Sequence, residues 1–191
     1  YCFLEDRGVP DPPTIEKDPL VTSQRAGLMS PGWRDDQVDL RFTEEACRWI
    51  QNVCDRPFFL YLASAAPHRP CVPPEFVRGT SGCGPRGDSV ALVDWMFGRV
   101  VAALDSAGVL DHTIVVFTSD NGAPTMFPED GDVTDHRPNG AWRGQKADAY
   151  EGGYRVPLIV AGPGVLAGVD DAPVSLLDLL PSAADWAGAV P

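Results

Sequence analysis

Two adjacent residues, Asp120 and Asn121, place a carboxylate and an amide side by side at the end of a predicted strand. They follow residues 113–119, a run rich in β-branched residues that is typical of a strand buried on both faces. In open α/β sheets, ligands collect just beyond the carboxyl ends of the strands, so the pair predicts a metal or anion site. Asp, Asn and Gly are also common turn formers, and residue types alone leave a simple turn as the alternative.

The elements around this pair bring a histidine toward it. Residues 57–63 are almost wholly apolar and predict a second strand buried on both faces. The longest predicted helix follows, from about residue 88 to residue 107, and leads directly into the strand before Asp120. Strand, helix, strand is the parallel crossover of an α/β sheet, so both strands are expected to end at the same edge. This places His68, in the loop after residues 57–63, in one crevice with Asp120.

The remaining pattern is that of a mixed chain. Residues 1–31 contain several prolines and predict irregular structure. A helix is predicted from Thr43, as its N-cap, to near Asp55. Residues 156–161 predict a further strand, and residues 175–187 predict a closing helix capped by its first serine. We therefore expect an α/β fold.

Composition and charge exclude several classes of partner. The chain has 191 residues, of which 44% are hydrophobic and 22% charged, as in a globular protein. Its net charge of −12 and its pI near 4.5 argue against nucleic acid or an anionic membrane as a partner of the whole surface. No apolar run approaches the roughly 18 residues that a membrane span needs. We expect no nucleic-acid partner and no membrane span in this chain.

Three stretches, in this order and spacing, resemble the sulfatases of the alkaline-phosphatase-like superfamily. They are Pro-Phe-Phe-Leu-Tyr-Leu at 57–62 with Pro67-His68, Phe-Thr-Ser-Asp-Asn-Gly at 117–122, and Arg-Gly-Gln-Lys at 143–146 followed by Glu151-Gly-Gly. The similarity covers nearly the whole chain. It implies that residues 1–191 are part of a sulfatase catalytic domain, with a mixed or mostly parallel sheet flanked by helices.

The resemblance assigns roles to individual residues. Asp120 and Asn121 match the pair that coordinates the family's divalent cation, usually Ca²⁺. Lys146 matches the lysine that touches the sulfate group, and His68 matches the histidine that contacts the ester near its bridging oxygen. A metal, a lysine and a histidine suit the hydrolysis of a sulfate monoester, which needs charge neutralised on the non-bridging oxygens and a proton at the leaving oxygen.

The long acidic loop of residues 123–142 leads into Arg-Gly-Gln-Lys at 143–146, which we call the lysine motif. Loops of this length in compact domains are usually functional or mobile, and the acidic residues at 129–135 are most simply read as a solvated face. His136 is predicted to bind substrate, with a turn cap as the alternative. Arg143 is expected either to support the sulfate electrostatically or to pair with Glu151.

The nucleophile that the resemblance implies does not occur in this chain. Family members use a Cys or Ser of a C/S-x-P-x-R motif, oxidised to formylglycine, whose hydrate attacks sulfur. The two approximate matches fail, because Glu75 follows Cys71 and Gly87 follows Cys83 at the position of the arginine. We therefore expect an internal fragment of a sulfatase, cut at both ends, with its formylglycine encoded upstream. As a separate molecule it is expected to be inactive.

Two other functions stay open. A phosphodiesterase or phosphonate hydrolase of the same superfamily would act on an ester of the same tetrahedral geometry, with two transition-metal ions rather than one Ca²⁺. A non-catalytic remnant would only bind. For a sulfatase the expected substrate is a small-molecule, carbohydrate or lipid sulfate ester, and the expected location is the periplasm or the cell exterior, because family members are often exported.

Overall fold

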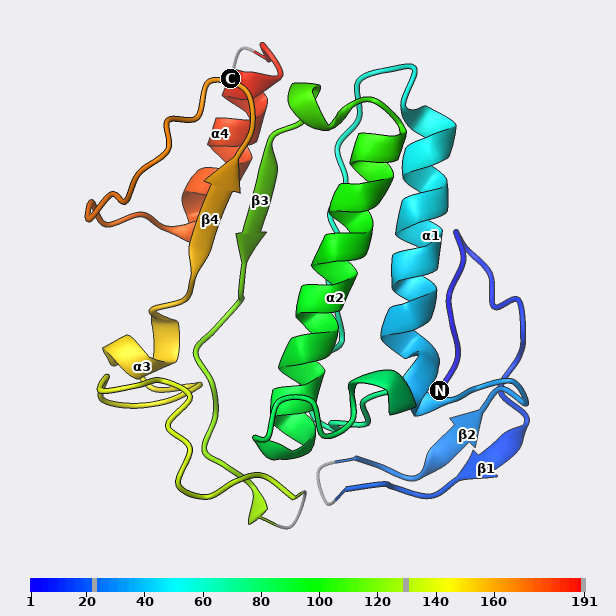
Figure 1. The fold of residues 1–191 in the computed structure, drawn as a ribbon. Coiled ribbons are helices and arrows are strands. Elements are labelled where there is room, and N and C mark those ends of the chain that lie inside the picture. The colour runs from blue at the N-terminus through cyan, green and yellow to red at the C-terminus, as the bar shows by residue number, and fades with distance from the viewer. Residues whose placement is uncertain (22–23, 129–130, 190–191) are drawn as a thin grey trace.

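Two long helices form the centre of the molecule (Figure 1). The structure is a computed structural model that describes residues 1–21, 24–128 and 131–189. Helix α1 spans Val38–Val53 and helix α2 spans Gly84–Ser106, and the two pack side by side. Ala46, Ile50 and Val53 recur at helical spacing on α1, and all three are buried. The amphipathic pattern of α1 therefore faces the core as the sequence predicts.

Helix α1 starts earlier than its predicted N-cap. Thr43 lies inside the helix, is 1% exposed, and donates its hydroxyl proton to the carbonyl oxygen of Asp39 at 2.7 Å. The prediction of Thr43 as N-cap is wrong, because a threonine can satisfy its hydroxyl within a helix by bonding the carbonyl four residues earlier. Helix α2 likewise begins four residues before its predicted start.

The main hydrophobic cluster joins both helices to the layer beside them. Its buried members are Ile50, Ala103 and Leu104. Phe58 and Leu60 pack against this cluster from one segment, and Val115 packs against it from another. The helices therefore share one apolar face with two extended segments that are more than 50 residues apart in sequence.

Residues 57–63 are extended but are not a strand. No ladder includes them within the described ranges, and Phe59 and Tyr61 are 75% and 82% exposed. The predicted double burial is wrong here, because the side chains alternate: Phe58 and Leu60 reach the helices, while Phe59 and Tyr61 point away from them. An apolar run does not reveal which of its faces is covered.

The strand before Asp120 is confirmed. Strand β3 spans Val115–Thr118 and pairs antiparallel with β4, Leu158–Ala161, with Val115 opposite Ala161 and Thr118 opposite Leu158. Figure 1 shows that β3 runs from the C-terminal end of α2 back toward its N-terminal end. Because residues 57–63 form no ladder, the predicted parallel pairing is not seen within the described ranges, where both ladders are antiparallel. The chain combines helices and strands, which gives it α/β character.

The two ends of the chain add smaller elements. Strands β1 (Ile15–Lys17) and β2 (Gly27–Met29) form an antiparallel hairpin where irregular structure was predicted. Near the other end, Ser175 caps a short helical turn that continues into α4, Leu179–Trp186, which confirms the predicted closing helix. Shorter helices within the described ranges include η1 (Asp35–Gln37), η2 (Glu75–Val77), η3 (Leu110–His112), α3 (Glu151–Tyr154) and η5 (Leu176–Asp178). No helix within the described ranges has the length and apolar character needed to cross a membrane.

The central cluster should dominate the stability of the fold. Replacing Ile50, which is 0% exposed, with alanine is expected to lower the free energy of unfolding by about 2–5 kcal/mol, because the cavity between α1 and α2 cannot close fully. Val90→Ala is the matched control, since Val90 lies on α2 and is 53% exposed. Chemical denaturation of both variants measures the difference, and equal effects would contradict the assignment of Ile50 to the core.

Candidate active site

The residues predicted to bind metal follow strand β3 directly. Asp120 is exposed, and its carboxylate has no hydrogen-bond partner within the described ranges. The side-chain nitrogen of Asn121 donates to the carbonyl oxygen of Gly122 at 3.1 Å, which leaves the amide oxygen as the group available to a ligand. The hydroxyl of Ser119 donates to the carbonyl oxygen of Asn121 at 3.1 Å and closes the turn. Carboxylate and amide oxygens together suit a hard cation.

Four glycines pack residues 120–122, which we call the metal motif after their predicted role, against the lysine motif of residues 143–146 and the segment that follows it. A Cβ atom on Gly122 would overlap the carbonyl group of Gly152, and one on Gly152 would overlap the carbonyl group of Gly144. A Cβ on Gly153 would overlap the carbonyl oxygen of Asp148. The backbone nitrogen of Gly122 also donates to the carbonyl oxygen of Gly153 at 2.9 Å. We call Gly122, Gly144, Gly152 and Gly153 the glycine junction, and only residues without a side chain allow this approach.

Lys146 is tied to the same junction by its backbone. Its nitrogen donates to the carbonyl oxygen of Ala123 at 3.0 Å, two residues after Asn121. The next residue, Ala147, has φ +75°, a left-handed conformation that costs an L-residue about 1–2 kcal/mol. The Lys146 side chain is half-buried, and its ammonium has no ion-pair partner in the part of the chain that the structure describes. The lysine is thus held beside the metal motif without a structural counter-ion.

Asn139 reinforces this connection and was not among the predicted site residues. Its side-chain oxygen accepts from the backbone nitrogen of Ala123 at 2.9 Å, and its side-chain nitrogen donates to the carbonyl oxygen of Ala123 at 2.9 Å. The same nitrogen lies 3.4 Å from the carbonyl oxygen of Gly144. In sequence, Asn139 precedes Gly140 and reads as an ordinary turn former, so nothing in the pattern pointed to this role.

The arginine of the lysine motif does not pair with the glutamate that follows. The Arg143 guanidinium lies over the Tyr150 ring, 3.8 Å from its centroid. Glu151 instead pairs with Arg155 at 3.1 Å and accepts from the hydroxyl of Tyr154 at 2.9 Å. The bond from Arg155 holds the pKa of the Glu151 carboxyl below its ordinary value. Of the two alternatives for Arg143, the pairing with Glu151 is therefore excluded, and support of the sulfate stays a prediction.

His68 lies on an exposed loop that a buried carboxylate holds in place. Asp39, on the first turn of α1, accepts from the backbone nitrogens of Ala65 and Ala66 at 2.7 and 2.9 Å. The backbone nitrogen of His68 donates to the carbonyl oxygen of Ala65 at 3.0 Å. The ring nitrogen Nδ1 lies 2.8 Å from the carbonyl oxygen of Arg69, and because a carbonyl only accepts, this bond requires a proton on Nδ1. Nε2 is then the nitrogen left for substrate.

The loop of residues 123–142 connects the two parts of the site. The Arg69 guanidinium lies 3.8 Å from the centroid of the Phe127 ring. Residues 65–70, which we call the histidine loop, therefore contact the segment that follows Asp120 and Asn121. Asp132 is buried, which makes the prediction of a solvated acidic face wrong for this residue; residues 129 and 130 lie outside the described ranges. His136 is exposed, and no hydrogen bond from its ring joins it to the other predicted residues within the described ranges, so its role stays a prediction.

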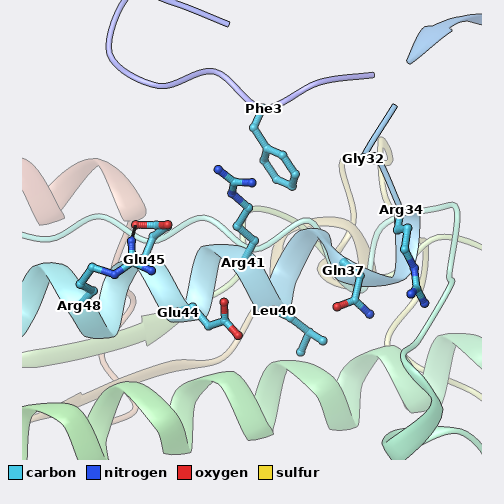
Figure 2. Close-up of a pocket in the computed structure, with 9 residues that line it drawn as sticks. All are labelled: Phe3, Gly32, Arg34, Gln37, Leu40, Arg41, Glu44, Glu45 and Arg48. Atoms are coloured by element: carbon cyan, nitrogen blue, oxygen red, sulfur yellow. Dashed lines mark hydrogen bonds and ion pairs between the residues drawn. The ribbon is translucent and has the colours of Figure 1, made fainter. Parts of the chain in front are cut away.

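A shallow groove elsewhere on the molecule does not compete with this site. It runs along α1, and Figure 2 shows Arg34, Arg41 and Arg48 among the residues that line it. Arg34 pairs with Asp36 at 2.7 Å and Arg48 with Glu45 at 2.6 Å, while Arg41 lies over the ring of Phe3. These arginines are neutralised or covered within the chain, and the groove contains none of the predicted site residues.

Known proteins are similar to this chain over most of its length. A family model described as sulfatase matches residues 9–189. The chain belongs to the sulfatase family. It is 39% identical over 150 residues to an N-acetylgalactosamine-6-O-sulfatase of Bacteroides thetaiotaomicron, a match that covers 73% of this chain and 29% of the relative. Arylsulfatase A of Homo sapiens is 42% identical over 136 residues, with 71% of this chain and 26% of the relative covered.

The fold agrees with a solved structure as well. A protein from work on the metabolism of multiple glycosaminoglycans by Bacteroides thetaiotaomicron superimposes with a TM-score of 0.78 and 36% identity, over 85% of this chain and 35% of that one. The sulfatase chain thus spans between about a quarter and a third of the length of these relatives. The predicted α/β, alkaline-phosphatase-like fold class is confirmed.

The sulfatase family implies a bound metal, and the donor atoms here fit part of such a site. Asp120 and Asn121 would supply two oxygens to a hard cation of this kind, fewer than such a cation takes. No group of three or more His, Cys, Asp and Glu side chains is placed to hold a metal within the described residues. The chemistry of the pair fits a hard cation, and these two residues would form only part of its ligand set.

The glycine junction gives the first test of the site. Gly122→Ala is expected to lower the free energy of unfolding by about 1–3 kcal/mol and to speed amide exchange at residues 120–123 and 144–153, because the new methyl group would overlap Gly152. Gly98→Ala, on α2 with open space around its Cβ position, is the control and should be neutral or stabilising by up to about 1 kcal/mol. Similar effects from both changes would contradict the junction.

Asp39 gives a pH-dependent test. Burial raises the pKa of its carboxyl above the ordinary 3.8, against the opposing effect of the Ala65 and Ala66 amides. The folded state therefore binds this proton more tightly than the unfolded state does. The stability that Asp39 contributes is fully present below about pH 3.8 and is lost as the pH rises through the raised pKa.

The measurement compares the wild-type protein with Asp39→Asn, which does not titrate at this position. We expect the wild-type free energy of unfolding, minus that of the variant, to fall as the pH increases from about 4, measured by denaturation at a series of pH values. A difference that instead grows with pH would show that the two amide bonds outweigh burial.

Proposed function

We propose that the protein carrying this chain is a sulfuric ester hydrolase of the arylsulfatase type. The observation that carries the proposal is the backbone connection between Asp120–Asn121 and Lys146, made by the bond from Lys146 to Ala123 and by the glycine junction. This connection supports the proposal, because it holds the backbone of two proposed oxygen ligands beside the backbone of a lysine that has no ion-pair partner within the described residues. Such an arrangement suits a tetrahedral anion whose charge must be neutralised as the ester breaks.

Each side chain has a role in this hydrolysis. The ammonium of Lys146 binds a non-bridging sulfate oxygen and neutralises part of its charge. His68 keeps a proton on Nδ1 through its bond to the Arg69 carbonyl, so Nε2, when protonated, is the atom that donates to the leaving oxygen as the sulfur–oxygen bond breaks. His136 is proposed to contact the substrate outside the sulfate group.

The proposed cation is Ca²⁺, held in part by Asp120 and Asn121. When bound, it supplies positive charge to the sulfate oxygens, which adds to that of Lys146. The proposed nucleophile is a formylglycine that lies outside residues 1–191, since no C/S-x-P-x-R sequence occurs within them. The contribution of this chain is then to bind the sulfate and to protonate the leaving group.

A sulfated carbohydrate is the substrate class that we favour. One relative, 39% identical, is an N-acetylgalactosamine-6-O-sulfatase, and the solved structure with a TM-score of 0.78 comes from work on glycosaminoglycan metabolism. Arylsulfatase A, which is 42% identical, supports an aryl sulfate as a usable test substrate. A sugar sulfate should therefore be turned over with the higher kcat/KM.

The test measures kcat/KM for an aryl sulfate and for a sulfated monosaccharide in the full-length protein. Lys146→Ala is expected to reduce kcat/KM by roughly 10²–10³-fold, as the loss of a group that stabilises developing charge does. Asp120→Ala should abolish turnover together with Ca²⁺ binding. Arg56→Ala is the control for Lys146→Ala, and Asp111→Ala is the control for Asp120→Ala. Each removes an exposed charge of the same sign away from the site and should leave turnover unchanged.

Undiminished activity in Asp120→Ala would refute the assignment of this protein as a metal-dependent sulfatase. Two bound transition-metal ions, combined with turnover of a phosphodiester but not of a sulfate ester, would identify the phosphoryl hydrolase instead. Ca²⁺ binding without turnover of either ester would identify a protein that only binds.

A further inference from the structure

The segment that follows the metal motif is docked onto the start of helix α2. Gly131 has φ +81°, and its nitrogen donates to the carbonyl oxygen of Pro128 at 3.0 Å. The carbonyl group of Gly131 lies where a Cβ atom of Gly84 would be, and the ring of Pro85 packs on Gly131 from the other side. This close fit requires glycine at both positions, so the segment has a defined place on the helix.

A buried ion pair fixes the same segment. Asp132 is 6% exposed as a residue, and its Oδ2 accepts from Nε and Nη2 of Arg86 at 2.9 and 2.8 Å. The backbone nitrogen of Phe127 donates to the same oxygen at 2.8 Å. Oδ1 is buried and has no hydrogen-bond partner in the described part of the chain, so the carboxylate depends on these three donors. Arg86 and Asp132 are 46 residues apart and join α2 to the loop.

The ion pair positions an aromatic ring beside the histidine loop. The guanidinium groups of Arg69 and Arg86 lie over the Phe127 ring, 3.8 and 5.4 Å from its centroid. Arg69 directly follows His68, and its carbonyl oxygen is the partner of His68 Nδ1. The contact with Phe127 thus links the 123–142 loop to the residue whose carbonyl oxygen bonds the imidazole of His68.

We propose that Arg86, Phe127 and Asp132 form a positioning device, the Phe127 clamp, that sets His68 relative to Asp120 and Asn121. None of the three touches substrate in this proposal. Asp132 and Arg86 hold Phe127, Phe127 holds Arg69, and the Arg69 carbonyl holds the ring of His68. The effect on turnover rests on the proposed sulfatase function, whereas the effect on the histidine loop does not.

The experiment uses the full-length protein and two independent readouts. Phe127→Leu keeps an apolar side chain but removes the aromatic face, and Asp132→Asn keeps the shape but removes the charge. In both, amide exchange at residues 65–70 is expected to rise several-fold, measured by mass spectrometry, and the ¹⁵N resonances of the His68 ring, assigned with His68→Gln, are expected to shift. Asp105→Asn, an exposed carboxylate on α2, is the control for both readouts.

Kinetics with an aryl sulfate provide the second readout. A misplaced proton donor should lower kcat by roughly ten- to a hundredfold in Phe127→Leu while KM changes little, because the bond to the leaving oxygen matters most in the transition state. The pH profile of kcat should shift as well, which a purely structural role would not produce.

The outcomes separate the clamp from the function. In Phe127→Leu, faster amide exchange confined to residues 123–142, with residues 65–70 and the His68 resonances unchanged, would overturn the clamp. This outcome is decisive even if Asp132→Asn fails to fold. Changes at residues 65–70 in a protein without sulfatase turnover would support the clamp and refute the function. Equal losses in kcat from Phe127→Leu and Asp105→Asn would also count against the proposal.

Discussion

The close contact of main chain with main chain at the glycine junction is the constraint on which this site depends. Gly122 lies against Gly152, and Gly152 lies against Gly144, at separations that no Cβ atom permits. The contact joins segments about 30 residues apart in sequence, and it places the end of β3 beside the loop that carries Lys146. The side chains that we propose to bind ligand are thus positioned by backbone contacts between glycines, which have no side chains.

Burial and hydrogen bonding separate two kinds of carboxylate in this acidic chain. Asp39 and Asp132 are buried. Asp39 accepts two backbone N–H groups from a loop that is distant in sequence, whereas Asp132 accepts from the distant side chain of Arg86 and from the backbone nitrogen of Phe127 in its own loop. Asp120 is exposed and accepts no hydrogen bond within the described ranges. The first two act as internal braces for the His68 loop and the 123–142 loop. The lone pairs of the third are free of hydrogen bonds from the described residues, as its proposed role in metal binding requires.

Local patterns revealed much of this architecture. The helical spacing of Ala46, Ile50 and Val53 marked the buried face of α1, and the β-branched run before Asp120 marked β3. Residues 57–63 were misread as buried on both faces because periodicity records apolar character and not what covers it. Likewise, the roles of Asn139 and Asp132 come from partners 16 and 46 residues away, which no window of sequence contains. The motifs predicted the site, and only the tertiary contacts showed how its backbone is held.

The attachment of Lys146 has a consequence for how such a site can diverge. The position of its Cα is set by a bond between its own backbone nitrogen and the carbonyl oxygen of Ala123, which any residue except proline can make. A different side chain at position 146 would therefore extend from the same Cα position beside the same neighbouring residues. Binding preference at this position can change by a single substitution, while the glycines around it remain fixed.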